Sequence, residues 1–354
     1  MNPRAILVTG AAGFIGSFLC KRLLAEYPEL TIVGYDNLND YYDISLKRER
    51  LEMVKQADAS GRFRFVLGDI CDTNQLSVVF DQYNPGIVVN LAAQAGVRHS
   101  IQHPRDYIDS NIVGFFNVLE QCRSHRVSHL VFASSSSVYG DTATAPFAES
   151  EPCNEPISLY AATKKADEAL AYSYASLYGV PCTGLRLFTV YGPMGRPDMA
   201  YFRFAEDMVA GNPIRLFNGG DMLRDFTYID DIVEGIFRVV VAPGPKPAAR
   251  GDGTVPYRVF NIGHGNPVPI LEFVSTLETA LQAAGALEGD AEYEYLPMQA
   301  GDVHRTYADT SALQSRYGYT PETTLEEGLA QFAHWFAQRM GIERESGLDS
   351  TLAR

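Results

Sequence analysis

Two side chains that could handle a proton lie four residues apart in the segment LYAATKK. Tyr160 and Lys164 fall on a predicted helix, where residues at this spacing share one face. A tyrosine phenol ordinarily has a pKa of about 10, and a neighbouring ammonium lowers it by favouring the phenolate. Tyr160 could then act as a general base near neutral pH. The same spacing occurs by chance on ordinary helices, so the pair gains weight only from its surroundings.

A run of hydroxyls follows the apolar segment HLVF, which is typical of a buried strand. Ser134, Ser135, Ser136 and Ser137 come directly after it. In open α/β sheets, ligands bind at the carboxyl ends of the strands. Serine hydroxyls form hydrogen bonds but cannot do strong acid–base work at neutral pH. The run predicts a site that holds a ligand through neutral groups; the alternative is that these hydroxyls only cap the strand end.

The segment TGAAGFIG places three glycines between the first predicted strand and the first predicted helix. Gly10 permits a tight turn, Gly13 lets a pyrophosphate approach the backbone, and Gly16 lets the helix pack close to the sheet. The helix N-terminus then faces the phosphates. A glycine triplet alone can be only a turn. Its place after a strand and before a helix indicates dinucleotide binding.

Asp36 ends the second predicted strand, 20 residues after Gly16. An acid at this spacing accepts hydrogen bonds from ribose hydroxyls and repels a 2′-phosphate, which favours NAD over NADP. The alternative is an ordinary acid at the start of a loop. Arg48 and Arg50 lie nearby on a helical pattern, and both are expected to face solvent.

Short apolar runs alternate with amphipathic helical patterns through the first half of the chain. This alternation predicts an α/β fold with a doubly wound parallel sheet, a Rossmann-like NAD domain, and a smaller, irregular α/β substrate domain. Asp72 is a candidate helix cap. The expected strands are 5–10, 31–36, 63–69, 86–93, 129–135, 181–188 and 257–263. The expected helices are 14–27, 44–58, 72–83, 104–125 and 158–179.

The pattern loosens after about residue 190, where Pro and Gly become more frequent. We therefore expect an NAD-binding domain over residues 1–188, rejoined by parts of 225–265, and a second, substrate-binding domain over 189–340. Residues 341–354 form a polar tail. The segment 243–256 is a surface loop by its composition.

Composition excludes several classes of partner. The 354 residues carry a formal net charge of −14, which argues against nucleic acid or an anionic membrane as a partner. No apolar run approaches the ~20 residues of a membrane span. Five scattered cysteines fit a reducing, cytoplasmic location. No metal is expected, because the histidines lack metal-ligand spacing: His99, His103, His125, His129, His264 and His304.

Seven motifs run collinearly through residues 9–231: TGAAGFIG, YDNLNDYY, LAAQAGVRHS, FASSSSVYG, YAATKK, FTVYGPMGRPDMA and RDFTYIDD. AGDVHRTYADT extends the match to about residue 310. In these motifs the chain resembles the extended short-chain dehydrogenase/reductases, specifically the nucleotide-sugar 4-epimerases, and within them most resembles the UDP-glucuronate 4-epimerases. The resemblance implies NAD as cofactor and a UDP-sugar as substrate, which makes residues 189–340 a UDP-sugar-binding domain. It also implies a homodimer, with helices over roughly 104–123 and 158–179 at its interface.

The resemblance also assigns site residues. It implies Ser135, Tyr160 and Lys164 as the catalytic set. The implied cofactor contacts are Gly10, Gly13, Phe14, Ile15, Gly16, Asp36, Asn37, Asn39, Asp69, Ile70, Leu91, Ala92, Ala93, Gln94, Asn111, Ser134, Tyr160 and Lys164. The implied UDP clamp uses Arg196, Arg224 and Asp302, with Phe217 near the uracil. Relatives often carry an arginine where Gln299 stands, and Arg305 is an extra arginine nearby, so the diphosphate partner here stays open.

The serine run separates three chemistries of oxidised nucleotide sugars. Related dehydratases carry Asp-Glu after the catalytic Ser or Thr, and decarboxylases carry a Glu in this strand end; here Ser136 and Ser137 stand there. A 4-keto uronic acid is a β-keto acid that loses carbon dioxide easily. Neutral donors that fix its carboxylate would suppress this loss, and we expect Ser136, Ser137 and Thr189 in that role. Arg98 is the cationic alternative, with a solvent-facing loop position equally expected.

The resulting prediction is NAD-dependent C4 epimerisation of a UDP-sugar, most directly UDP-glucuronate to UDP-galacturonate, through a transient 4-keto intermediate. The alternatives are UDP-glucuronate decarboxylase, a nucleotide-sugar dehydratase or an epimerase of the UDP-glucose type. A non-catalytic NAD-binding sensor is an alternative of another class, and the intact Ser135, Tyr160 and Lys164 count against it.

Overall fold

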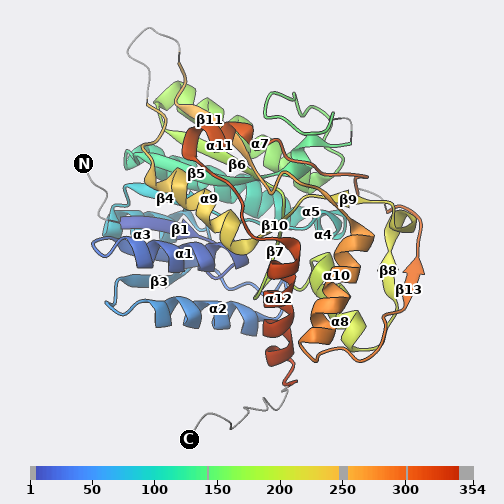
Figure 1. Cartoon of the computed structure of the whole chain (residues 1–354). Coiled ribbons are helices and arrows are strands. Elements are labelled where there is room, and N and C mark those ends of the chain that lie inside the picture. Colours follow the sequence, from blue (N-terminus) through green and yellow to red (C-terminus); the bar gives the residue numbers. More distant parts are fainter. Residues whose placement is uncertain (1–4, 142, 247–253, 300–301, 343–354) are drawn as a thin grey trace, which may run out of the picture.

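Seven parallel strands form the central sheet of the molecule (Figure 1), seen in a computed structural model that describes residues 5–141, 143–246, 254–299 and 302–342. The order across the sheet is β11-β6-β5-β4-β1-β2-β3. Each strand was predicted from the sequence, with ends that differ by at most three residues. The strands are β1 (Ala5–Thr9), β2 (Thr31–Asp36), β3 (Phe63–Leu67), β4 (Ile87–Asn90), β5 (His129–Ser135), β6 (Cys182–Leu187) and β11 (Tyr257–Ile262).

Helices cover both faces of this sheet. Alternate residues of β1 point to opposite faces. Ile6 and Val8 join one core cluster, whereas Ala5 and Leu7 join the other. The first face is packed by α1 (Phe14–Glu26), α2 (Ile44–Ala57) and α9 (Ile229–Val241), and the second by α3 (Thr73–Tyr83), α6 (Phe115–Ser124) and α7 (Leu159–Tyr178). This doubly wound arrangement confirms the predicted fold class.

The helix predicted over residues 104–125 has a widened middle. It comprises α5 (Pro104–Tyr107), a π-helical segment η1 (Ile108–Gly114) and then α6. Such π-helical turns are frequent at functional sites. A short helix that the sequence did not predict, α4 (Val97–Gln102), precedes this run. Together they form one wall beside the end of β4.

A smaller lobe lies beside the sheet, on the right of Figure 1. Three strand pairs build it, β7 with β10, β9 with β12, and β8 with β13. Its strands are β7 (Thr189–Tyr191), β8 (Ile214–Leu216), β9 (Leu223–Arg224), β10 (Phe226–Tyr228), β12 (Val268–Pro269) and β13 (Tyr293–Tyr295). Its helices are α8 (Ala200–Val209), α10 (Ile270–Ala283) and α12 (Leu325–Arg339). α11 (Ser311–Tyr317) instead packs beside β11 and α9 at the sheet, and the short 3-10 turns of the chain are η2 (Ser136–Tyr139) and η3 (Phe217–Gly220).

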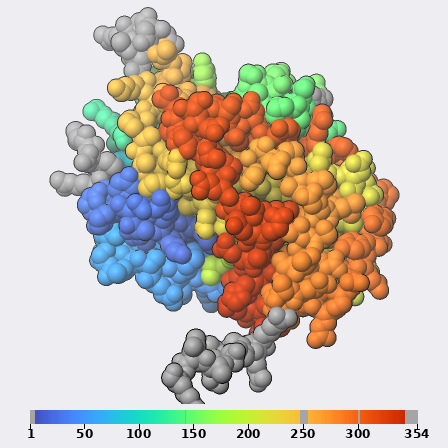
Figure 2. Space-filling model, in the orientation of Figure 1, coloured from blue at the N-terminus to red at the C-terminus, as the bar shows by residue number. Residues whose placement is uncertain are grey.

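An ion pair joins the lobe to a helix of the sheet, and later parts of the chain return to the sheet itself. Arg339 of α12 forms an ion pair with Glu49 of α2, and Figure 2 shows α12, in red, beside the blue N-terminal region. α9 packs on α1, and β11 pairs with β6. The contacts of α9 and β11 support the prediction that parts of 225–265 rejoin the first domain; the domain boundaries themselves stay a prediction.

Parts of two predicted segments lie outside the described residues, namely 247–253 of the loop 243–256 and 343–354 of the tail 341–354. Within the described part of the chain, no helix is long and apolar enough to cross a bilayer.

Local sequence signals start the helices where they are needed. The Asp72 carboxylate accepts a hydrogen bond from the Gln75 N–H at 3.0 Å, which confirms it as the cap of α3. Ser158 caps α7 in the same way through the Ala161 N–H at 3.1 Å. This cap fixes the first turn of α7, which carries Tyr160.

Arg50 is the clearest departure from the sequence-based expectation. Arg48 is exposed as expected, but Arg50 is fully buried. Its guanidinium donates to the carbonyls of Met194 and Gly195 at 2.6 and 3.1 Å, and to the Ala12 carbonyl at 3.3 Å. The expectation of solvent exposure was wrong because carbonyl oxygens from two distant loops satisfy this cation. Arg50 thereby joins α2, the glycine-rich turn and the loop after β7.

Replacing Arg50 by Met should strongly destabilise the protein, because buried carbonyl groups would lose a charged donor. We expect the free energy of unfolding to fall by about 3 kcal/mol or more. The matched control is Arg48→Met on the same helix, which should change stability by less than about 0.5 kcal/mol. Urea unfolding of the two variants measures the difference. Equal effects would contradict the structural role given to Arg50.

Candidate active site

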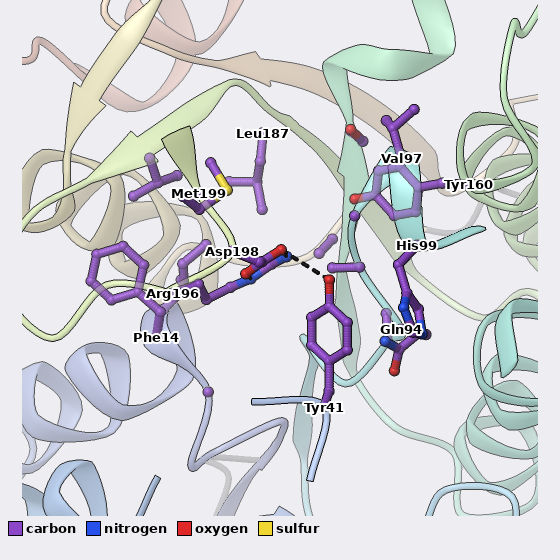
Figure 3. Close-up of a pocket in the computed structure, with 18 of the residues that line it drawn as sticks. Phe14, Tyr41, Gln94, Val97, His99, Tyr160, Leu187, Arg196, Asp198 and Met199 are labelled. Atoms are coloured by element: carbon purple, nitrogen blue, oxygen red, sulfur yellow. Dashed lines mark hydrogen bonds and ion pairs between the residues drawn. The ribbon is translucent and has the colours of Figure 1, made fainter. Parts of the chain in front are cut away.

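A pocket of about 860 Å³ opens at the carboxyl ends of the strands, between the sheet and the smaller lobe. Figure 3 shows Tyr160, His99 and Gln94 on one side of it, and Phe14, Arg196 and Met199 on the other. All but one of the predicted site residues line this pocket, and Asn111 is the exception. The structure thus brings into one cavity residues that span the chain from Gly10 to Asp302.

The glycine-rich turn leaves no room for side chains. Gly10 has a φ of 71°, and a Cβ atom there would lie 2.8 Å from the backbone at Leu91 and Ala92. A Cβ atom at Gly16 would lie 2.1 Å from the Gly10 carbonyl oxygen. The turn therefore brings bare backbone and the N-terminus of α1 to the pocket, which is the geometry that binds a pyrophosphate.

Asp36 presents its carboxylate beside this turn. Its Oδ2 accepts a hydrogen bond from the Ala12 N–H at 3.0 Å, and its Oδ1 accepts one from the Leu38 N–H at 2.9 Å. Each carboxylate oxygen has two lone pairs, so both retain capacity for another donor. The backbone fixes the orientation of the carboxylate and leaves it able to accept ribose hydroxyls.

Polar side chains continue along the rim past Asp36. The Asn37 amide donates to Asp69 Oδ2 at 2.9 Å, and the Cys71 N–H donates to Asp69 Oδ1 at 2.8 Å. Burial acts to raise the pKa of Asp69, but these hydrogen bonds hold it below its ordinary value. Lys47, which the sequence did not single out, is buried here and donates to the backbone and side-chain oxygens of Asn39. The Lys47 ammonium is thereby engaged by Asn39.

Asn111 lies behind the pocket wall. Its Oδ1 accepts from the Gln94 N–H at 2.8 Å, and its Nδ2 donates to the Gln94 carbonyl at 3.0 Å and to Thr163 Oγ1 at 2.9 Å. The expected direct cofactor contact is therefore corrected, because every polar atom of this amide is used inside the protein. Asn111 holds Gln94 against α7, the helix of the predicted base.

The serine strand end is held by local hydrogen bonds. The Ser134 hydroxyl donates to Glu168 Oε1 at 2.7 Å, so this hydroxyl is already engaged within the protein. Ser135 Oγ accepts from the Ser137 N–H and donates to Ser137 Oγ, both at 3.1 Å. Within the described residues, no hydrogen bond engages the Ser136 hydroxyl. Ser135 therefore caps the strand end, as the alternative interpretation of the serine run predicted, although it also lines the pocket. Ser136 and Ser137 line the pocket as well.

Two oxygen acceptors hold the Lys164 ammonium in position. Its Nζ donates to the Ala133 carbonyl at 3.0 Å and to Asp167 Oδ2 at 3.1 Å, and both side chains of the ion pair are buried. An ammonium has three donors, so one remains for the pocket, which Tyr160 also lines. Asp167 was not predicted. Burial raises the pKa of its carboxyl to about 6, although the Lys164 ammonium acts in the opposite direction.

The arginines at the opposite end are already paired with acids. Arg224 Nη2 donates to Asp302 Oδ1 at 2.8 Å, and Arg98 Nη2 lies 3.7 Å from Asp302 Oδ2. The Arg98 guanidinium also lies 5.1 Å from the ring centroid of Phe217. These contacts place Arg98 with the predicted UDP clamp, which weakens its alternative role as a partner of the sugar carboxylate.

Arg196 forms a two-point ion pair with Asp198, at 3.0 Å for Nε–Oδ1 and 2.5 Å for Nη2–Oδ2. Tyr41 donates to the same carboxylate at 3.0 Å, as the dashed line in Figure 3 shows. Burial acts to raise the pKa of Asp198, but Arg196 and Tyr41 hold it below its ordinary value. Neither Asp198 nor Tyr41 was predicted, because only the fold brings residue 41 to residue 198.

Neither expected diphosphate partner lines the main pocket. Arg305 lies instead in a second, smaller cavity beside Gly140 and Phe147, and Gln299 Oε1 is buried without a partner among the described residues. Arg203 of α8 and Arg215 of β8 do line the main pocket, and sequence reasoning missed both. The only available signal was a basic residue standing alone among apolar neighbours in each segment.

Replacing Asp167 by Asn tests how the buried carboxyl is held. Its folded-state pKa lies above the ordinary value of 3.8, so the folded state binds the proton more tightly than the unfolded state. The stabilising contribution of Asp167 is therefore full below about pH 4 and is lost as the pH rises to about 6. Relative to Asp167→Asn, the free energy of unfolding of the wild type should fall by up to ~3 kcal/mol across this window. Urea unfolding of both proteins as a function of pH measures this; a difference that stays flat would contradict the prediction.

Comparison with known proteins places the chain among relatives of similar length. The profile of the NAD dependent epimerase/dehydratase family matches residues 6–263. Protein CapI of Staphylococcus aureus is 46% identical, over 94% of this chain and 98% of that protein. A probable UDP-glucuronate 4-epimerase of Rhizobium meliloti is 42% identical, over 94% of this chain and 96% of that protein.

A solved structure agrees with this assignment. The UDP-glucuronic acid 4-epimerase from Bacillus cereus, in complex with UDP-glucuronic acid and NAD, superposes with a TM-score of 0.83 at 33% identity. The match covers 95% of this chain and 99% of that one. Sequence, fold and pocket therefore lead to one conclusion: this chain belongs to the NAD-dependent epimerase/dehydratase family.

Proposed function

We propose that this protein is an NAD-dependent epimerase that inverts C4 of UDP-glucuronate to give UDP-galacturonate through a transient 4-keto sugar. The observation that carries this proposal is the single pocket. It is lined by the glycine-rich turn and Asp36, by Ser135, Tyr160 and Lys164, and by a group of arginines at the far end. The relatives named as UDP-glucuronate 4-epimerases support the same activity.

The residues present fit NAD better than NADP. A Cβ atom at Gly10 or Gly16 would clash with neighbouring backbone, so glycine at both positions permits the tight turn that presents the N-terminus of α1 to a pyrophosphate. The Asp36 carboxylate, held by two backbone N–H groups, suits free ribose hydroxyls and repels a 2′-phosphate. Lys47 is engaged by Asn39 and does not offset that repulsion.

In the proposed mechanism Tyr160 takes the proton of the C4 hydroxyl, with Ser135 bridging the two oxygens. Lys164 lies one helical turn after Tyr160 and lines the same pocket, with its third N–H donor left for a ligand. Bound NAD supplies a reversible acceptor for the C4 hydride. The arginines of the pocket hold UDP while the keto sugar rotates to present its other face. Binding energy from the remote nucleotide thereby positions the reacting carbon. Tyr160 then returns the proton to the inverted alcohol.

The acids of the pocket argue against the dehydratase and decarboxylase alternatives. Four aspartates line it: Asp36, Asp69, Asp198 and Asp302. Each is tied to backbone, amide or arginine partners, and none lies at the serine strand end. Neutral hydroxyls from Ser136, Ser137 and Thr189 would therefore meet the sugar carboxylate. NMR of the product made from UDP-glucuronate tests the proposed activity, with UDP-galacturonate as the expected product and UDP-pentose as the contrary one.

We also propose a homodimer. η1, α6 and α7 lie together on one face and leave large apolar side chains exposed, including Val113, Phe116, Leu177 and Tyr178. Two copies of this face would bury them as a four-helix interface. All five cysteines are free thiols, which supports the proposal of a reducing, cytoplasmic location.

Replacing Tyr160 by Phe removes the phenolic oxygen and keeps the ring. Turnover of UDP-glucuronate should fall by at least ~10²-fold, because the general base is lost, while UDP binding measured by calorimetry should remain. The control is Tyr172→Phe, an exposed tyrosine on the same helix, which should turn over normally. If Tyr160→Phe turns over UDP-glucuronate at a near-normal rate, Tyr160 is not the general base.

Replacing Ser136 or Ser137 by Ala should loosen the grip on the sugar carboxylate, at a cost of about 1–3 kcal/mol per hydrogen bond to a charged group. The freed carboxylate could align its C–C bond with the ketone, so UDP-pentose and carbon dioxide should appear beside the epimer. Ser134→Ala is the matched control, because that hydroxyl bonds to Glu168. Its products should contain no pentose. Epimer, pentose and carbon dioxide should be measured together for each variant. If both Ser136→Ala and Ser137→Ala form the epimer without pentose, the proposed hold on the carboxylate is wrong.

A further inference from the structure

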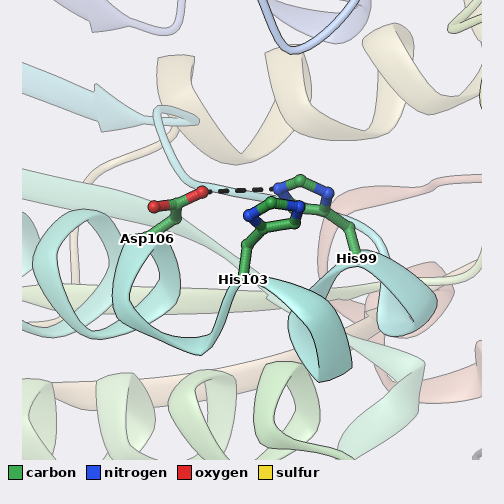
Figure 4. A group of neighbouring side chains, drawn as sticks. All are labelled: His99, His103 and Asp106. Carbon is green, nitrogen blue, oxygen red and sulfur yellow. Dashed lines mark hydrogen bonds and ion pairs between the residues drawn. The ribbon is translucent and has the colours of Figure 1, made fainter.

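Two histidines and an aspartate meet where α4 and α5 join (Figure 4). His99 lies on α4, His103 connects the two helices, and Asp106 lies on α5. Their potential ligand atoms all lie within 4.8 Å of one another. The sequence was expected to hold no metal site, because no spacing of histidines indicated one. Only the sharp turn between these two short helices brings the three side chains together.

We propose that these three residues bind a divalent transition-metal ion, zinc or an ion of similar ligand preference, at the mouth of the substrate pocket. Two imidazoles and one carboxylate suit Zn²⁺, Co²⁺, Ni²⁺ or Cu²⁺, whereas Mg²⁺ and Ca²⁺ prefer all-oxygen sites. Three protein ligands leave a coordination position for water.

The distances suit such an ion. Zn–N and Zn–O bonds of about 2.0–2.2 Å place neighbouring ligand atoms roughly 3.4 Å apart in a tetrahedral site. His99 Nε2 and Asp106 Oδ2 already lie 3.4 Å apart. The His103 ring stacks on His99 with centroids 4.3 Å apart, so it must turn to direct a nitrogen at the same ion. His103 is exposed, and the χ2 torsion of histidine is broad, so this turn meets little resistance.

The neighbouring arginines pair with other acids, so the His99, His103 and Asp106 side chains remain available to a metal ion. Arg105 pairs with Asp109 at 2.8 Å, and Arg98 is directed toward Asp302. No lysine or arginine ion pair therefore competes for Asp106 among the residues that the structure describes. His103 and Asp106 are exposed, so an ion can enter from solvent.

His99 links this cluster to the pocket. Its ring packs edge-on against Tyr41 at 4.7 Å between centroids and lies 6.0 Å from Tyr107. Tyr41 in turn bonds to Asp198, and the Tyr107 ring lies 6.1 Å from that of Tyr160. An ion bound by His99 therefore fastens α4 to α5 in the wall that faces the substrate.

Titration with cobalt alone tests the proposal, because Co²⁺ reports its ligands by visible absorption. The holoprotein should carry no affinity tag, and chelator should be used and then removed. We expect one equivalent of Co²⁺ to bind. His103→Ala and Asp106→Asn should each weaken binding by at least ~10-fold. Losing a residue that only hydrogen-bonds to a metal ligand already costs about 10- to 100-fold in metal affinity. His334→Ala, an exposed histidine on α12, is the matched control and should bind like the wild type.

Thermal unfolding gives an independent readout. An ion that binds only the folded state raises the Tm, so Zn²⁺ should raise it in the wild type and in His334→Ala but not in His103→Ala or Asp106→Asn. Circular dichroism and retained NAD confirm that each variant is folded. The proposal is overturned if the wild type binds no cobalt, or if either His103→Ala or Asp106→Asn binds it as tightly as the wild type does.

Discussion

A buried carboxylate fixes the geometry on which the active site depends. Glu168 of α7 accepts a two-point ion pair from Arg186 of β6, at 2.8 and 2.9 Å, and a hydrogen bond from Ser134 of β5 at 2.7 Å. Arg186 and Ser134 are themselves buried. One residue thereby locks the helix that carries Tyr160 and Lys164 to the strand that ends in Ser135. Removing either member of the Arg186–Glu168 pair would leave the other as a poorly compensated buried charge.

The pocket reverses the charge balance of the molecule. The chain carries a net charge of −14, yet seven lysines and arginines and only four aspartates line the pocket. The acids paired with Arg196 and Arg224 hold these guanidinium groups in place before a ligand arrives. A locally basic cleft in an acidic protein suits an anionic nucleotide sugar.

Features set by local sequence were predictable, and features set by distant contacts were not. The glycine turn, Asp36, the Asp72 cap and the Tyr160–Lys164 pair each depend on residues close together in the chain. The burial of Arg50, in contrast, depends on carbonyls about 40 and 145 positions away. Asp198 was missed for the same reason, since its pairing becomes meaningful only once Arg196 and Tyr41 face one cavity.

Two further differences have their own physical causes. The sequence pattern of residues 104–125 indicates a helix but carries no sign of the π-helical turn. That turn places Asn111 where its amide is consumed by Gln94 and Thr163 rather than by a ligand. Arg305 was considered as a diphosphate partner only because it is an extra arginine near Gln299, and it lies in another cavity.

In the proposed reaction the hydride removed from C4 stays in the pocket and returns to the same carbon. Turnover of UDP-glucuronate deuterated at C4 measures this. We expect UDP-galacturonate to retain the deuterium at C4 and no reduced cofactor to accumulate in solution. Loss of the deuterium to water, or stoichiometric release of NADH, would contradict it.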